Sequence, residues 1–219
     1  MPPHSNAKER NAMNKKIVIG MAILGAAGLI GCATTLSESD AAKRAAEVMR
    51  SSFVAKGIAG MDRLDQDEVQ ALCTEYADKA MPKEVAEKIQ KSQLASVQKP
   101  ASGKLIGDWK AGEKIAQEGR GFQFSDTADG PKGANCYACH QLSPKEISYG
   151  NIGPSLYQYG KQRGYGPEIV GYTYNKVYNS NAYSACSNMP RVGHKKLLTP
   201  EQIADVLGLL LDPESPVNQ

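Results

Sequence analysis

The chain has 219 residues, of which 41% are hydrophobic, and its formal net charge is +3. This length suits one domain with an appendage, or two small domains. Residues 1–31 hold four of the 26 basic and one of the 23 acidic residues, so the remainder carries 22 of each and no net charge. This balance excludes a broad basic surface of the kind that binds nucleic acid.

The N-terminus has the pattern of an export signal. Lys15 and Lys16 precede an uncharged run of 14 residues, 17–30, that is mostly apolar or Gly. The run is too short to cross a bilayer comfortably, and it is typical of the central region of a signal peptide. We therefore expect export of the protein to the periplasm.

Cys32 ends this run in the order Leu-Ile-Gly-Cys. The order resembles a bacterial lipoprotein box, in which the cysteine is lipidated and becomes the first residue. The alternative is ordinary cleavage after Ala33, with Gly31 and Ala33 as the small residues of the cleavage site. Lipidation is favoured because a cysteine in that position is otherwise rare in exported proteins. The interpretation is a signal peptide over residues 1–32 and a lipid anchor at Cys32 that holds the protein to a membrane.

Three helices are predicted next. The first covers residues 37–57, the second follows Asp65 as its N-cap, and the third has Pro82 in its first turn. Their apolar residues recur at helical spacing, and their charges are typical of a solvated face.

The chain is expected to divide at a Pro- and Gly-containing linker over residues 98–107. Residues 33–100 are then a helical N-terminal segment with its linker, and residues 101–219 form a second domain. No strand pattern is present, so the predicted fold class is all-α.

The second domain is predicted to open with a helix from Trp109 to Glu118, capped by Asp108. Gly112 would weaken this helix by about 1 kcal/mol relative to Ala. A glycine there suggests close approach of another backbone, although chance explains a single glycine equally well. Residues 137–183 contain nine of the ten tyrosines and recurrent glycines, which predicts a loop-rich region.

The last predicted helix has the clearest start. Thr199 is its N-cap, Pro200 takes the first position and Gln202 completes a capping box. Asp212 and the proline after it end the helix. Its apolar stripe consists of Ile203, Val206, Leu207, Leu210 and Leu211.

Residues 136–140 read Cys-Tyr-Ala-Cys-His, the C-x-x-C-H attachment signature of a c-type haem. The thiols of Cys136 and Cys139 can add to two vinyl groups on one edge of a porphyrin, and His140 can then serve as the proximal iron ligand. The alternatives are a redox dithiol, a disulfide or half a zinc site. A redox dithiol needs a βαβ context and a zinc site needs a second Cys/His pair, and neither pattern is visible. We therefore expect one covalently bound haem c.

Met189 is the predicted distal ligand, since it is the only methionine after residue 81. It lies on a loop with Pro190 before the last helix, so the chain can wrap round the porphyrin and return on its far face. His194 is the alternative, and its lysine neighbours favour a surface position. A thioether ligand raises the haem potential, and two filled axial positions exclude small ligands. This ligand set favours electron transfer over oxygen chemistry.

Cys73 and Cys186 remain, and two spare thiols in an oxidising compartment tend to pair. The bridge would close a loop of about 110 residues and stabilise the fold by nearly 5 kcal/mol at most. It would tie the second predicted helix to the loop that carries Met189. The alternative is that Cys73 is an ordinary core residue and Cys186 is free or bonded to a partner subunit.

A helix before the motif, Gly-Pro-Ser-Leu at 153–156 and a methionine loop before a terminal helix together resemble class I cytochromes c. The resemblance implies that the N–H of His140 donates to the carbonyl of Pro154. It also implies that Gly112 lets the first helix of the domain cross the terminal helix. The implied fold is a class I cytochrome c domain preceded by a helical N-terminal segment.

A closer resemblance is to the SoxX subunit of the bacterial sulfur-oxidising system, and it covers roughly residues 105–218. The family commonly has Phe where Val192 stands, and residues 37–100 and the lipoprotein box are not part of its core pattern. The matching stretches are Asn-Met-Pro-Arg-Val-Gly at 188–193, Leu-Thr-Pro-Glu-Gln-Ile at 198–203, and Leu-Asp-Pro-Glu-Ser-Pro-Val-Asn at 211–218.

In that family SoxX pairs with SoxA, whose haem has a modified cysteine ligand and joins thiosulfate to a cysteine of a sulfur-carrier protein. The released electrons pass to the SoxX haem and on to a soluble cytochrome c. The resemblance implies that this chain is the electron-accepting subunit of an L-cysteine S-thiosulfotransferase complex, with the catalytic centre on a SoxA-like partner. The rival interpretations are a stand-alone membrane-anchored cytochrome that serves a terminal oxidase, and a peroxidase with an open axial position.

Overall fold

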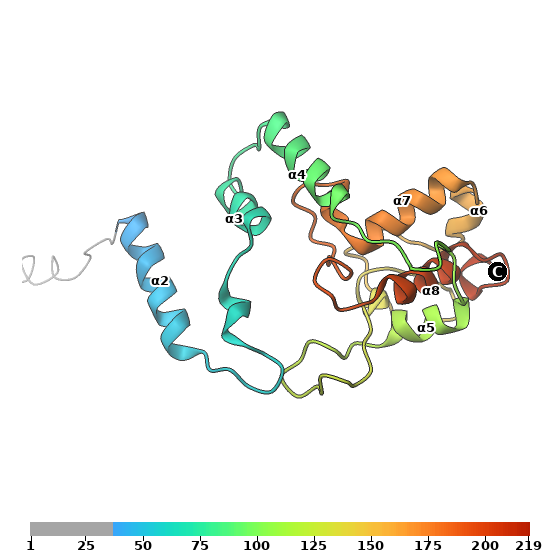
Figure 1. The fold of residues 1–219 in the computed structure, drawn as a ribbon, viewed down its shortest axis with the longest axis horizontal. Coiled ribbons are helices and arrows are strands. Elements are labelled where there is room, and N and C mark those ends of the chain that lie inside the picture. Colours follow the sequence, from blue (N-terminus) through green and yellow to red (C-terminus); the bar gives the residue numbers. More distant parts are fainter. Residues whose placement is uncertain (1–36) are drawn as a thin grey trace, which may run out of the picture. The chain divides into compact units, whose positions relative to one another are not determined.

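The computed structural model describes residues 37–219 (Figure 1). These residues form helices, 3₁₀ helices and loops, without a strand apart from one isolated bridge between Lys56 and Ala59. The all-α prediction is confirmed for this part of the chain. The predicted signal peptide and Cys32 lie outside the described residues.

The chain divides into two compact units after Ser52. In the first unit, the described residues form one helix, α2 (Glu38–Ser52), with acidic residues in its first turn and no buried side chain. The helix ends five residues before Gly57, where the sequence predicted its end. The second unit runs from residue 53 to residue 219.

The second unit begins with a short 3₁₀ helix, η1 (Met61–Leu64), followed by α3 (Glu68–Glu75). The N-cap of α3 is Asp67, not the predicted Asp65, because Asp65 already ends η1 as its C-cap. The Asp67 carboxylate accepts the backbone N–H of Gln70, and the Gln70 side chain accepts the backbone N–H of Asp67. This reciprocal pair is a capping box that fixes where α3 starts.

Helix α4 (Lys83–Ala95) has Pro82 as its N-cap, one position before the first turn in which the sequence placed it, and packs against η3 (Ser180–Ala182). The amide of Asn179 donates to the side-chain oxygen of Gln93 at 2.9 Å, and Asn179 is fully buried. The sequence placed a domain boundary at residues 98–107, whereas the structure keeps α3 and α4 in the same unit as everything that follows. Contacts of this kind, between residues far apart in the sequence, explain the difference.

Helices α5 (Trp109–Gln117) and α8 (Pro200–Leu211) have the predicted N-caps. The Asp108 carboxylate accepts a backbone N–H from the first turn of α5. Thr199 and Gln202 form the predicted capping box of α8. Both helix starts are therefore determined locally by the sequence.

Backbone contact joins α5 to α8, which lie side by side in Figure 1. A Cβ atom on Gly112 would lie 2.1 Å from the carbonyl oxygen of Asp205, and one on Gly208 would lie 2.5 Å from the carbonyl oxygen of Gly107. No side chain fits at either glycine unless the backbones separate. The close approach suggested by Gly112 is confirmed.

The main hydrophobic core surrounds α8, and the five residues of its predicted stripe are all buried. The chain after α8 folds back as a 3₁₀ helix, η4 (Pro216–Asn218). The amide of Asn218 donates to the carbonyl oxygens of Leu210 and Asp212, and its side-chain oxygen accepts the N–H of Gly160. Asn218 thus satisfies carbonyls that the helix end would otherwise leave unpaired.

The prediction of a loop-rich region over residues 137–183 was wrong for part of its length. Two helices lie there, α6 (Tyr159–Arg163) and α7 (Pro167–Tyr178). Helix α7 starts at a proline after Gly166 and contains Gly171, and most of its other residues are aromatic, β-branched or polar. Glycine, aromatic and β-branched residues have low intrinsic helix propensity, so tertiary packing against α8 contributes to the formation of this helix.

We predict that Gly112→Ala lowers the free energy of unfolding by about 1–3 kcal/mol, because the new methyl group must push α5 away from α8. Urea-induced unfolding measures the change. Gly171→Ala is the matched control, since a Cβ there meets nothing within 4 Å. The control is expected to be neutral or more stable by about 0.5–1 kcal/mol. Equal stability of the two variants would contradict the backbone contact.

Candidate functional site

The C-x-x-C-H motif forms a tight turn that begins with the 3₁₀ helix η2 (Cys136–Ala138). The backbone N–H groups of Cys139 and His140 both donate to the carbonyl of Cys136, at 3.1 and 2.9 Å. A helical turn places side chains three positions apart on the same side. Cys136 and Cys139 therefore present two free thiols to one side of the turn.

One hydrogen bond determines the chemical state of the His140 ring. Its Nδ1 lies 2.7 Å from the carbonyl oxygen of Pro154. A carbonyl oxygen can only accept, so Nδ1 carries a proton, and in the neutral ring Nε2 then has a free lone pair. Histidines that bind metals are commonly oriented in this way. The bond joins the two residues that the resemblance to class I cytochromes c paired.

Residues 150–156, which we call the strap, pack alongside the C-x-x-C-H motif and bond to its backbone. The N–H groups of Gly150, Gly153 and Leu156 donate to the carbonyls of residues 137, 139 and 141, at 2.8, 2.8 and 2.7 Å. A Cβ atom on Gly153 would lie 2.2 Å from Cε1 of His140 and 2.6 Å from its Nε2. Glycine at this position therefore lets the strap close against the imidazole ring and hold it in place.

The surroundings of the thiols disfavour a redox dithiol. Burial, with a smaller contribution from the neighbouring Cys139, raises the pKa of the Cys136 thiol to about 11. Thiols that exchange disulfides depend on a lowered pKa, because the thiolate is the nucleophile. No βαβ unit surrounds the motif either, since residues 37–219 contain no strand element.

Met189 lies on residues 179–195, which we call the methionine loop. The Met189 side chain is partly buried and packs against the same hydrophobic core as Cys136. Its backbone is held at both polar groups: the N–H donates to the Ser187 hydroxyl at 3.2 Å, and the carbonyl accepts from the Ser180 hydroxyl. Met189 and Cys136 thus pack against the same core, each through its own partly buried side chain.

His194, the alternative ligand, is half-buried, whereas the sequence favoured a surface position. Burial lowers its pKa, and the positive charges of Arg191 and Lys195 lower it further. Its Nδ1 lies 3.5 Å from the hydroxyl of Ser96, so the ring faces the end of α4. His194 therefore contacts the C-terminal end of α4.

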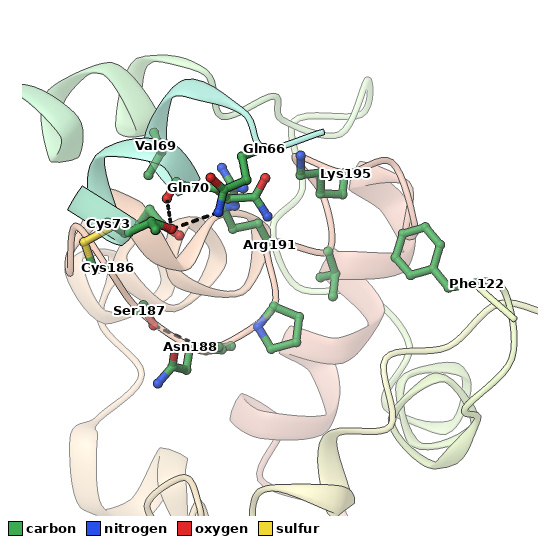
Figure 2. Close-up of a pocket in the computed structure, with 15 residues that line it drawn as sticks. Gln66, Val69, Gln70, Cys73, Phe122, Cys186, Ser187, Asn188, Arg191 and Lys195 are labelled. Carbon is green, nitrogen blue, oxygen red and sulfur yellow. Dashed lines mark hydrogen bonds between the residues drawn. A yellow bond between two sulfur atoms is a disulfide. The ribbon is translucent and has the colours of Figure 1, made fainter. Parts of the chain in front are cut away.

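Cys73 and Cys186 form a disulfide in the structure, with Cα atoms 5.6 Å apart, a separation within the usual range. The bridge is the pair expected from the sequence, and it joins α3 to the methionine loop. Figure 2 shows it at the edge of a cavity of about 460 Å³ between these two elements. The cavity is lined from α3 and the residues before it by Gln66, Val69, Gln70 and Thr74, and from the loop by Ser187, Met189, Arg191 and Lys195, among others.

Three charged residues in and beside this cavity were missed by the sequence analysis. The Asp67 carboxylate oxygen Oδ2 lies 2.6 Å from Arg191 Nη2 and 2.7 Å from Lys195 Nζ. Burial raises the pKa of Asp67, but hydrogen bonds from Lys195, the Gln70 amide and Arg191 outweigh it and hold the pKa well below its usual range. The only sequence signal was the position of Arg191, two residues after Met189.

A second cavity lies beside the motif turn and is lined in part by Tyr137, Ala138 and Glu146. The Glu146 oxygen Oε2 is buried without a hydrogen-bond partner, and burial raises the pKa of this carboxyl to about 7. Over residues 37–219, no group of three or more His, Cys, Asp or Glu side chains is arranged to hold a metal ion. In the same part of the chain, no helix has the length and apolar character needed to cross a membrane.

Comparison with known proteins shows a similarity to a bacterial lipoprotein. A protein of Aquifex aeolicus (strain VF5), described as an uncharacterized lipoprotein, is 42% identical over 130 residues. The match covers 59% of this chain and 61% of the relative, so the chain spans less than two thirds of the relative's length. No protein-family model matches the chain.

Proposed function

We propose that this chain is a mono-haem c-type cytochrome that transfers electrons. The observation that carries the proposal is the hydrogen bond from His140 Nδ1 to the Pro154 carbonyl within a C-x-x-C-H turn. This bond fixes the imidazole tautomer that a proximal haem ligand requires. A redox dithiol has no need of a histidine held in this state.

The residues present fit a haem c. Cys136 and Cys139 would form the two thioether bonds, His140 would be the proximal ligand and Met189 the distal ligand. The bound group would supply a one-electron iron couple whose potential is tuned by its axial ligands. Because Gly153 has no side chain, the backbone of the strap can lie directly against the His140 imidazole. The hydrophobic core that packs against both Cys136 and Met189 would keep water from the ring.

The test is Met189→Ala in the holoprotein. We expect loss of the near-infrared charge-transfer band of methionine–iron ligation and a midpoint potential lower by roughly 0.1 V, since axial ligands set haem potentials over a span of about 0.8 V. His194→Ala is the control and should change neither. Absence of the band from the wild-type spectrum would contradict Met189 as the ligand.

The proposed role is that of the electron-accepting subunit beside a SoxA-like cytochrome. The partner would couple thiosulfate to a cysteine of a carrier protein, and this haem would pass the released electrons to a soluble cytochrome c. The support is the SoxX-like sequence of the methionine loop and of residues 211–218, and Asn218 in that stretch caps α8. The alternative is a stand-alone membrane-anchored cytochrome c that serves a terminal oxidase.

Co-purification separates these two functions. A tagged chain isolated from its native host under mild conditions should bring down a second cytochrome in a fixed ratio. The isolated complex should then reduce this haem when thiosulfate and the carrier protein are added. A chain that purifies alone and is reduced by quinol oxidation instead would favour the terminal-oxidase function.

We further propose that Cys32 carries lipid and anchors the protein to a membrane on its periplasmic side. The support is the export pattern of residues 15–32, the lipoprotein description of the relative from Aquifex aeolicus, and a disulfide of the kind found in oxidising compartments. No role in nucleic-acid binding is proposed.

Metabolic labelling with a palmitate analogue tests the anchor. The wild type should take up the label and partition with membranes, and Cys32→Ser should do neither while still binding haem. The double variant Cys73→Ser/Cys186→Ser is the control, because it removes two other cysteines and should keep the label. Equal labelling of wild type and Cys32→Ser would show that the lipid is absent or elsewhere.

A further inference from the structure

Helix α3 is linked to the methionine loop at two points, one on each side of Met189. Cys73 bonds to Cys186, three residues before Met189. Asp67 pairs with Arg191, two residues after it. Between α7 and α8 the loop has only the short 3₁₀ helix η3 and no α-helix. Both of these links come from a single short helix and its N-cap.

Both oxygens of the Asp67 carboxylate are used. Oδ1 accepts the Gln70 backbone N–H and caps α3, while Oδ2 pairs with Arg191 and Lys195. The Arg191 side chain is only 7% exposed, and its Nη1 is buried without a partner. Removal of the carboxylate would leave a buried charge uncompensated, which is strongly unfavourable. The pair therefore opposes any movement of the loop away from α3.

Apolar contacts and a hydrogen bond also attach the methionine loop to α3 and α4. Val69 of α3, Ile89 of α4 and Ala185 of the methionine loop form a second small hydrophobic core. The Asn179–Gln93 hydrogen bond then joins α4 to the start of the loop. The loop is thus held against α3 and α4 by covalent, ionic and apolar contacts together.

We propose that α3 is a clamp that positions Met189 at the haem, with Asp67 and the Cys73–Cys186 bridge as its two positioning elements. The inference rests on the proposed function, in which Met189 is the distal ligand. The clamp keeps the thioether on the iron against competing small ligands and water. It also explains why a segment outside the SoxX-like region belongs to the same compact unit.

The test uses imidazole, which binds the ferric holoprotein only when Met189 leaves the iron. Asp67→Asn keeps the helix cap, because Asn caps as well as Asp, and removes the charge. Cys73→Ser/Cys186→Ser removes the bridge without a reductant that would also reduce the haem. Asp67→Asn should bind imidazole about tenfold more tightly, the change that corresponds to loss of one charged hydrogen bond. Cys73→Ser/Cys186→Ser should also bind imidazole more tightly than the wild type, because the covalent link to α3 is lost. The combination of both should increase the affinity further.

Glu87→Gln is the matched control, since it breaks an exposed ion pair with Lys83 in α4 that does not touch the loop. It should bind imidazole as the wild type does. Wild-type imidazole affinity in both clamp variants, with only a lower unfolding stability, would overturn the positioning role. If the double cysteine variant does not fold, the imidazole affinity of Asp67→Asn alone tests the positioning role. The near-infrared band of the wild type separately reports whether Met189 is the ligand, so failure of the proposed function is recognised independently.

Discussion

The direct backbone contact between α5 and α8 is the constraint on which both halves of the proposed haem site depend. Gly112 and Gly208 permit it, and each helix then determines the position of one half. The carbonyls of Ile115 and Glu118, at the end of α5, accept the N–H groups of the two residues before Cys136, both at 3.0 Å. The methionine loop leads directly into α8. A shift of either helix would therefore displace one side of the site relative to the other.

The proximal and distal sides of the proposed haem site are held by different kinds of interaction. The proximal side is local: residues 136–156 bond to one another through backbone groups and through the His140–Pro154 pair. The distal side depends on long-range side-chain links, of which the disulfide spans a sequence separation of 113. Backbone pairs within a short segment form with little loss of chain entropy, whereas the distal links close a long loop. The position of His140 is therefore determined by the motif and the strap. The position of Met189 depends on contacts across the whole second unit.

This difference decides what the sequence could predict. Helices α5 and α8 were predicted because Asp108 and the Thr199–Gln202 pair are local cap signals. Helix α7 was missed because its aromatic, β-branched and glycine residues carry no such signal beyond a starting proline. The His140–Pro154 bond came only through a resemblance, and the disulfide only from the count of remaining cysteines. The Asp67–Arg191 pair joins residues 124 positions apart, so no local pattern could reveal it. Its discovery required the folded chain.

Asp67 also links the local folding of α3 to the position of the methionine loop, because one carboxylate serves both. Its folded-state pKa lies below the unfolded value. The stability it contributes is therefore present above the unfolded pKa, and it is lost only as the pH falls through the lower, folded value. At neutral and mildly acidic pH the ionic part of the clamp is fully charged and insensitive to pH. The disulfide part responds to thiol reductants instead, so the two links on either side of Met189 are sensitive to different conditions.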